Sequence, residues 1–236
     1  MARIVVPTII KDLANFAKTK NKQVYLVGGA VRDWLIDNNK RLLDFDVCGD
    51  LTIDEIVEFA YNCGYKIKEK VTGIEVIKFD GEVSVQYARI RSEEYKKETN
   101  HFPSNVKFDV DLKDDARRRD FTINAIYYDL NSFKILDFFN GMSDITDKII
   151  RQICDNNFHS LSLDPERILR MIELSIRLNF KIEEQTLNLA FSKKNNLKLL
   201  SKDRFNILIS KIKSEYNGSL QQKQLLKQFD LLKYIF

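Results

Sequence analysis

Cysteine and histidine are scarce in this chain of 236 residues. The three cysteines, Cys48, Cys63 and Cys154, are isolated and follow no C-x-x-C spacing. The two histidines, His101 and His159, have no cysteine or histidine neighbour at ligand spacing. This usage argues against disulfide bonds and against a zinc site. It is typical of a reducing compartment, so we predict that the protein is cytoplasmic.

Long apolar runs are missing as well. No stretch approaches the roughly 18–20 apolar residues that a membrane span requires. The apolar start of the chain is too short for a signal peptide, because Pro7 and Lys11 interrupt it. Hydrophobic residues make up 44% of the chain and charged residues 31%, which is the balance of an ordinary globular protein without a membrane partner.

Glycine is distributed unevenly and divides the chain. Seven of the eight glycines lie at or before Gly141, together with nearly all segments of strand character, and only Gly218 follows. After Gly141 the apolar residues recur at helical spacing. We therefore predict an α+β protein, with an α/β domain over residues 1–141 and an all-α domain over residues 142–236.

Local patterns predict the elements of both domains. Thr52 and Glu55 fit a capping box at a helix start, and Asp80-Gly81 indicates a hairpin. Residues 92–105 are polar and without periodicity, so we expect a loop there. Helices are expected at 7–20, 52–64, 114–119, from 163 onward, and at 183–192, 201–216 and 219–235. Strands are expected at 24–27, 43–47, 65–69, 74–79, 83–90, 106–110, 125–130 and 134–139.

The stretch after the first expected strand has the features of an anion site. The apolar run 24–27 ends in Gly28 and Gly29, and residues 30–36 have the composition of a short helix. A strand that turns through glycines into a helix presents free N–H groups and the positive end of the helix dipole. Arg32 adds a planar fork that suits phosphate oxygens. Two glycines after a strand can also mark a turn and nothing more.

Two aspartates follow on the next expected strand. Because side chains alternate along a strand, Asp44 and Asp46 lie on the same face. Such a pair can hold hard cations, and Mg²⁺ prefers oxygen ligands together with substrate phosphates. A D-x-D sequence alone is usually solvated surface, but a phosphate cradle beside two carboxylates is the apparatus for transferring a nucleotide.

A run of arginines lies further along the chain. Residues 117–125 read RRRDFTINA, and three successive arginines cannot all be buried cheaply. A polyphosphate would supply the acceptors that these side chains need. The alternative is a solvated basic turn in which Asp114 and Asp115 are the partners.

The expected helix that starts near residue 163 carries a further charged motif. Residues 164–170 read DPERILR, and Asp164 and Arg167 are three positions apart, so they share a helix face. One accepts and the other donates, so the pair can present a base-like edge to a nucleotide. Aspartate followed by proline is also simply a good helix start. Both interpretations can hold together.

These motifs closely resemble those of the class II nucleotidyltransferases of the polymerase-beta superfamily, which include bacterial tRNA CCA-adding enzymes and poly(A) polymerases. The family pattern is LVGGxVRD followed by D-x-D, then RRDFTINA, then the neck motif E-D-P-x-R-x-L-R. The resemblance covers residues 24 to about 182. It implies a head domain with a mixed β-sheet and flanking helices over 1–141, and a helical neck with a truncated, RNA-binding body over 142–236.

The resemblance also implies an activity. The protein would add CMP, AMP or both from CTP and ATP to the 3′ end of tRNA without a template and release pyrophosphate. Asp44 and Asp46 would be catalytic and would hold two Mg²⁺ ions, and protein side chains would choose the base. The nucleotide would be bound by Gly28, Gly29, Arg32, Arg119, Asp164, Arg167 and Arg170.

Departures from the family pattern leave alternatives open. Gln86 occupies the position of a third metal-site carboxylate, and Glu173 replaces an arginine of the neck helix. Glu75, on a neighbouring expected strand, is a candidate substitute base. The chain could therefore be a poly(A) polymerase, an enzyme that adds only CC or only A, or a non-catalytic RNA-binding relative. The sequence does not indicate an oligomeric state.

The charge of the chain is concentrated near its end. Residues 191–228 contain nine Lys or Arg and two acids, a net of 9 − 2 = +7, although the whole chain carries only +4. A basic segment of this kind suits a polyanion such as RNA. A lysine-rich but functionally neutral helix surface explains the same numbers.

Overall fold

The chain folds into two compact units, each built from separate stretches of sequence. The computed structural model describes residues 3–95, 103–155 and 158–236. The first unit comprises 1–92, 106–118 and 123–145, and the second comprises 93–105, 119–122 and 146–236. The sequence suggested one boundary after Gly141, whereas the RRRDFTINA run itself is divided between the units. His101 lies outside the described residues.

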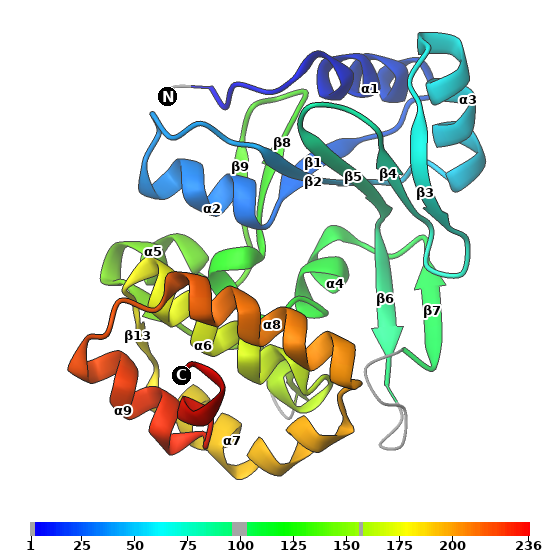
Figure 1. The fold of residues 1–236 in the computed structure, drawn as a ribbon. Coiled ribbons are helices and arrows are strands. Elements are labelled where there is room, and N and C mark those ends of the chain that lie inside the picture. Colours follow the sequence, from blue (N-terminus) through cyan, green and yellow to red (C-terminus); the bar gives the residue numbers. More distant parts are fainter. Residues whose placement is uncertain (1–2, 96–102, 156–157) are drawn as a thin grey trace. The chain divides into compact units, whose positions relative to one another are not determined.

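A seven-stranded sheet forms the centre of the first unit (Figure 1). Its spatial order is β3-β4-β5-β2-β1-β8-β9. β2 runs parallel to β5 and the other neighbours are antiparallel, so the sheet is mixed, as predicted. The strands are β1 (Val24–Val27), β2 (Asp44–Gly49), β3 (Ile67–Val71), β4 (Val76–Phe79), β5 (Ser84–Arg89), β8 (Ile126–Asp129) and β9 (Ile135–Asp137).

Helices α1 (Thr8–Thr19) and α3 (Ile53–Cys63) pack on one face of this sheet. The capping box at the start of α3 is confirmed, because Thr52 and Glu55 exchange both hydrogen bonds. Gly64 ends the helix in the left-handed region, where glycine has no steric penalty. The remaining helices of this part of the chain are α2 (Gly29–Ile36), α4 (Leu112–Arg117) and α5 (Gly141–Asp147).

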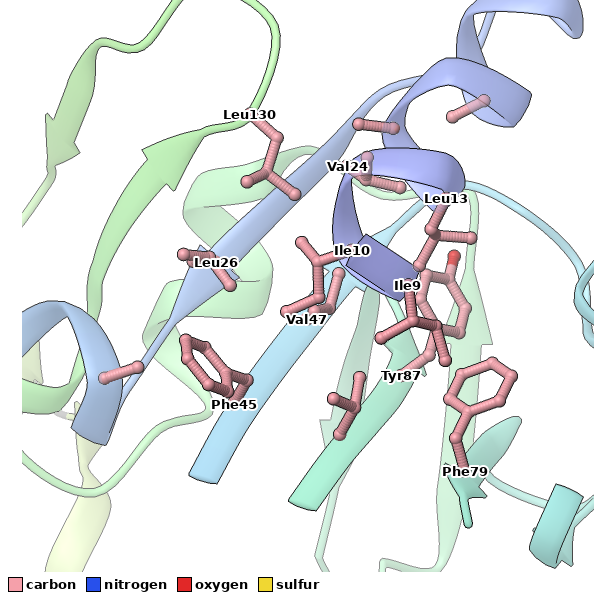
Figure 2. Close-up of a cluster of buried hydrophobic side chains, with 14 of the residues drawn as sticks. Ile9, Ile10, Leu13, Val24, Leu26, Phe45, Val47, Phe79, Tyr87 and Leu130 are labelled. Atoms are coloured by element: carbon pink, nitrogen blue, oxygen red, sulfur yellow. The ribbon is translucent and has the colours of Figure 1, made fainter. Parts of the chain in front are cut away.

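The apolar stripe of α1 supplies much of the core of the first unit. Figure 2 shows Ile10 and Leu13 facing the sheet beside Val47 and Tyr87. On β2, Phe45 and Val47 are 2% and 1% exposed and belong to this core. Their burial fixes the register of the strand, and it turns the alternate residues toward the opposite face.

The second unit is mainly helical. Its elements include α6 (Glu166–Leu178), α7 (Glu184–Ser192), α8 (Lys202–Glu215), α9 (Leu220–Gln228) and the short strand pairs β10 (Ile149–Ile150) with β13 (Lys181–Ile182) and β11 (Cys154–Asp155) with β12 (Phe158–His159). The predicted stripe of α6 is confirmed, because Ile168, Leu169, Ile172 and Ile176 are all buried. None of the helices in the described parts of the chain has the length and apolar character needed to cross a membrane.

Two predictions about elements were wrong in part. The expected loop at 92–105 contains β6 (Arg91–Glu94), which pairs with β7 (Asn105–Phe108) as a separate two-stranded sheet. β6 is polar and gives no apolar alternation from which it could be recognised, whereas β7 overlaps the strand predicted at 106–110. The helix expected at 219–235 ends at Gln228, because Asp230 adopts a left-handed conformation with a φ of 58°.

Candidate active site

The glycine turn and the two aspartates meet in the first unit. In the sheet register Asp46 lies opposite Val27, the last residue before the glycines. Gly28 has a φ of 75°, and a Cβ added there would lie 3.3 Å from Asp46 Oδ2. Any other residue would therefore be strained and would crowd the carboxylate. The glycine lets the backbone turn directly beside a negatively charged group.

Asp44 and Asp46 share the face of β2 that points away from the core. Asp44 is exposed and Asp46 is half-buried, while Phe45 between them is buried. The alternation that the sequence predicted is therefore present. Carboxylate oxygens on one face, next to backbone N–H groups at the start of α2, suit a hard divalent cation that also binds phosphate.

Gln86 lies beside these carboxylates on the neighbouring strand. It is paired with Asp46 in the parallel register of β2 and β5, and its neighbours Val85 and Tyr87 point into the core. Gln86 therefore faces the same side as Asp46. Over the described residues, no group of three or more His, Cys, Asp or Glu side chains is placed to hold a metal ion. The oxygen donors that fit a metal here are two carboxylates, with a neutral amide in the third position.

Glu75, the candidate substitute base, has other partners in the structure. It precedes β4, opposite Arg89, whose NH1 donates to both Glu75 carboxylate oxygens at 3.2 Å. It also accepts the Ile53 N–H at the start of α3. The residue of β4 that pairs with Gln86 is Lys78. Glu75 therefore stabilises the start of α3, and it does not lie opposite Gln86.

Arg32 lies beneath the glycine turn rather than open to solvent. The residue is 3% exposed; Nε donates to Asp33 Oδ1 at 2.8 Å, NH2 pairs with the same oxygen at 2.6 Å, and NH1 donates to Asn124 Oδ1 at 2.6 Å. A Cβ on Gly29 would lie 3.5 Å from Arg32 NH2. The guanidinium edge is thus close to the backbone of the turn.

Asp33 balances the charge at this point. Burial raises the pKa of Asp33, but Arg32 and the Lys40 ammonium, which lies 2.9 Å from Asp33 Oδ2, outweigh burial and lower the pKa. The carboxylate is therefore charged at neutral pH. Gly28 and Gly29 therefore lie between groups of opposite charge. Asp46 of the aspartate pair is close to Gly28, and the Arg32 guanidinium is close to Gly29.

In the second unit, the arginines of the neck motif hold the end of the RRRD run. Arg167 is 7% exposed, and its NH1 donates to the backbone carbonyls of Arg119 and Ser160 at 3.0 and 3.1 Å. Arg170 donates to Asp120 Oδ2 through Nε and NH2, at 2.7 and 2.6 Å. The Asp120 carboxylate raises the pKa of Arg170. Arg119 is therefore fixed against α6 through its own backbone.

Asp164 serves as a cap for α6. Its Oδ1 accepts the backbone N–H of Glu166 at 2.9 Å, which satisfies one of the free donors of the helix start. The interpretation of this motif as a good helix start is confirmed. Helix α6 begins at Glu166, so Asp164 lies just before its first turn, and the shared face of Asp164 and Arg167 stays a prediction.

The sequence analysis missed a buried carboxylate that organises α4. Asp115 is 0% exposed and accepts from Tyr127 Oη at 2.7 Å, from Arg118 Nε at 2.9 Å and from the Arg91 N–H at 3.3 Å. The pairing of Asp115 with the arginine run was foreseen, but as a solvated turn. No pattern in the local sequence separates this aspartate from the half-exposed groups around it.

Comparison with known proteins agrees with this arrangement. Residues 24–151 match the poly(A) polymerase head domain family. The CCA-adding enzyme of Staphylococcus saprophyticus is 34% identical over 216 residues, which is 90% of this chain and 51% of that protein. Poly(A) polymerase I of Salmonella typhi is 32% identical over 174 residues, or 70% of this chain and 36% of that protein.

Solved structures show the same relationship. The Thermotoga maritima CCA-adding enzyme in complex with tRNA is 29% identical, with a TM-score of 0.76 over 99% of this chain and 53% of that one. A CCA-adding enzyme in complex with ATP is 30% identical, with a TM-score of 0.75 over 98% of this chain and 54% of that one. The chain thus spans about half the length of the relatives it matches. It belongs to the poly(A) polymerase head domain family, within the class II nucleotidyltransferases of the polymerase-beta superfamily, as its motifs predicted.

Proposed function

We propose that the protein adds CMP and AMP from CTP and ATP to the 3′ end of tRNA, without a template and with release of pyrophosphate. The observation that carries this proposal is the carboxylate pair of β2 beside the glycine turn, with Asp46 Oδ2 against Gly28. Relatives at 31–34% identity are named CCA-adding enzymes, and related structures contain tRNA and ATP. Proteins of this superfamily use divalent metal ions.

Each part of the candidate site has a role in this reaction. Asp44 and Asp46 would hold two Mg²⁺ ions, which would supply charge neutralisation of the triphosphate and activation of the RNA 3′-oxygen. The N–H groups after Gly28 and Gly29, together with Arg32, would bind the phosphates. The RNA 3′-hydroxyl would release its proton to water, and its oxygen would bond to the α-phosphorus as the bond to pyrophosphate breaks.

Base choice would lie with the neck motif. The two carbonyl acceptors of Arg167 fix the plane of its guanidinium, so the edge that it presents is set before a nucleotide arrives. Asp164 is held just before the first turn of α6 by its bond to Glu166. A fixed donor and a fixed acceptor can discriminate bases without a template. Arg119 and Arg170 would complete the nucleotide-binding set.

The tRNA would bind to the basic helices of the second unit. Lys198, Lys202, Lys211, Lys213, Lys223 and Lys227 are exposed. Two other cations already have partners, because Arg204 pairs with buried Glu166 and Lys194 pairs with Asp230. Part of the positive charge therefore stabilises the helices, and the exposed remainder is available to phosphates.

A direct assay tests the proposal. The protein is incubated with Mg²⁺, tRNA lacking its 3′ end, and each labelled nucleoside triphosphate in turn. Incorporation of both CMP and AMP is expected. Long AMP tails would indicate a poly(A) polymerase, which the similarity to the Salmonella enzyme also favours. Incorporation of only one type of nucleotide would indicate a CC-only or A-only enzyme. Tight RNA binding without incorporation would favour a non-catalytic relative, consistent with Gln86.

A further inference from the structure

Arg32 is held by side chains from two different motifs. Asp33 follows it on α2, whereas Asn124 lies 92 residues further along the chain, at the end of the RRRDFTIN run. Both partners of the longer contact are buried, Arg32 at 3% and Asn124 at 6% exposure. Buried polar groups that lose a partner cost free energy, so this contact persists in the folded protein.

The contacts determine how the guanidinium is turned. The group is planar, and acceptors on Nε and NH1 fix both its plane and its rotation. In the resulting orientation NH2 pairs with Asp33 Oδ1 at 2.6 Å and lies 3.5 Å from the position of a Cβ on Gly29. Lys40 holds Asp33 in place at 2.9 Å. Asn124 supplies the contact at NH1, so removing it would loosen the orientation that Asp33 and Asn124 set together.

Because the Asn124 amide is neutral, it also preserves the positive charge that Arg32 brings to the site. A carboxylate at position 124 would be a second anion against Arg32, in addition to Asp33, and would weaken the positive potential that attracts phosphate. A neutral Oδ1 accepts the NH1 hydrogen bond at 2.6 Å without this effect. The Asp33 charge is itself shared between Arg32 and Lys40. Arg32 therefore remains a cation toward a ligand above the turn.

We infer that Asn124 is a positioning residue, whose Oδ1 fixes Arg32 in the orientation that binds the triphosphate of the incoming nucleotide. This inference rests on the proposed function, because it assumes that a nucleotide occupies the glycine turn. It gives the RRRDFTINA run a second task besides the one expected of Arg119, since its last polar residue supports the phosphate site of the first motif.

The test measures binding of ATP and AMP to the full chain by calorimetry with Mg²⁺ present. Asn124→Ala should raise the Kd for ATP by about 10- to 100-fold, the range expected for a lost hydrogen bond to a charged group. The Kd for AMP should rise far less, because AMP lacks the outer phosphates. Asn131→Ala, in the turn between β8 and β9, is the matched control and should change neither value, since this turn uses the Asn131 backbone N–H.

Two further variants separate positioning from a general structural role. In an Arg32→Ala background, Asn124→Ala should have no additional effect on ATP binding. Asn124→Asp keeps the shape and the acceptor, so it should fold normally; its added charge should weaken ATP binding, but by less than the loss of the contact does in Asn124→Ala. Equal losses for ATP and AMP, additive effects with Arg32→Ala, or a larger loss with Asp than with Ala would overturn the inference. Failure of the wild type to bind ATP would instead refute the proposed function.

Discussion

The charged groups of the two units are used differently. In the first unit, Asp44 and Asp46 lie on the face of β2 that points away from the core, beside a turn kept free of side chains. In the second unit, Asp164, Arg167 and Arg170 are also structural, because each bonds to the backbone or to a buried carboxylate. Substitutions in the first unit should therefore separate activity from stability, and substitutions in the second should affect both.

The largest expected effect is the loss of the metal ligands. Asp44→Asn or Asp46→Asn should abolish nucleotide transfer, because an uncharged amide is a poor Mg²⁺ ligand. The melting temperature should change little, since neither side chain belongs to the core. Asp80→Asn, at an exposed turn after β4, is the control. Near wild-type turnover in either variant would show that the metal site has been assigned wrongly.

The next effect concerns the amide beside the aspartates. Gln86→Glu would restore a third carboxylate next to Asp46 on the same face of the sheet. General-base assistance contributes roughly 10²–10⁴ in rate, so transfer should become faster by up to about 10²-fold without a change in nucleotide preference. Steady-state rates with CTP and ATP measure both quantities.

The outcomes of this substitution separate the remaining explanations. We expect a working site with two aspartates, so the wild type should already be active. A rate indifferent to Gln86→Glu would mean that two carboxylates suffice. An inactive wild type that gains transfer through Gln86→Glu would make the natural protein a non-catalytic relative. Glu75→Gln should affect stability rather than rate, because Glu75 is bound to Arg89 and to the start of α3.

The sequence predicted the first unit better where side chains follow simple periodicity. Alternation on β2 placed both aspartates, and the Thr52 capping box located α3. It could not predict the contact between Arg32 and Asn124, because the two residues are far apart in the chain and meet only through the pairing of β1 with β8. Buried polar pairs have no period, so a sequence pattern cannot place their partners.

In the second unit, too, the sequence did not predict the partners of buried charged groups. The helical stripe of α6 was correct, but the partners of its charged residues were not foreseen. Glu166, in the first turn of α6, is 2% exposed and binds Arg204 of α8. This ion pair connects two helices whose packing is a tertiary property.

A smaller effect is expected from the basic helices. Lys202 and Lys213 are eleven residues apart on α8, and at about 100° per residue they lie on one flank of the helix, whereas Lys211 lies on another. Lys202→Glu with Lys213→Glu should lower tRNA affinity and flatten its salt dependence if that flank contacts phosphates. Lys211→Glu tests the second flank. Unaltered affinity and salt slope in all these variants would move the RNA site elsewhere.

The smallest effect, and the sharpest test of the difference between the units, is expected at Asp164. Asp164→Ala removes the acceptor of the Glu166 N–H, which should cost about 0.5–2 kcal/mol of unfolding free energy. If Asp164 also reads the base, the same variant should relax the choice between CTP and ATP more than it weakens triphosphate binding. Denaturant unfolding and competition between the two nucleotides measure these quantities separately.

Asp164→Asn and Asp164→Ser divide the two roles further. Asparagine and serine are good capping residues, so both variants should retain most of the stability that alanine loses. Neither presents a carboxylate to a base, so both should still lose discrimination between CTP and ATP. Recovery of stability together with unchanged nucleotide preference would mean that Asp164 only starts the helix. Base choice would then rest with Arg167, whose orientation is fixed by two backbone carbonyls and does not depend on the cap.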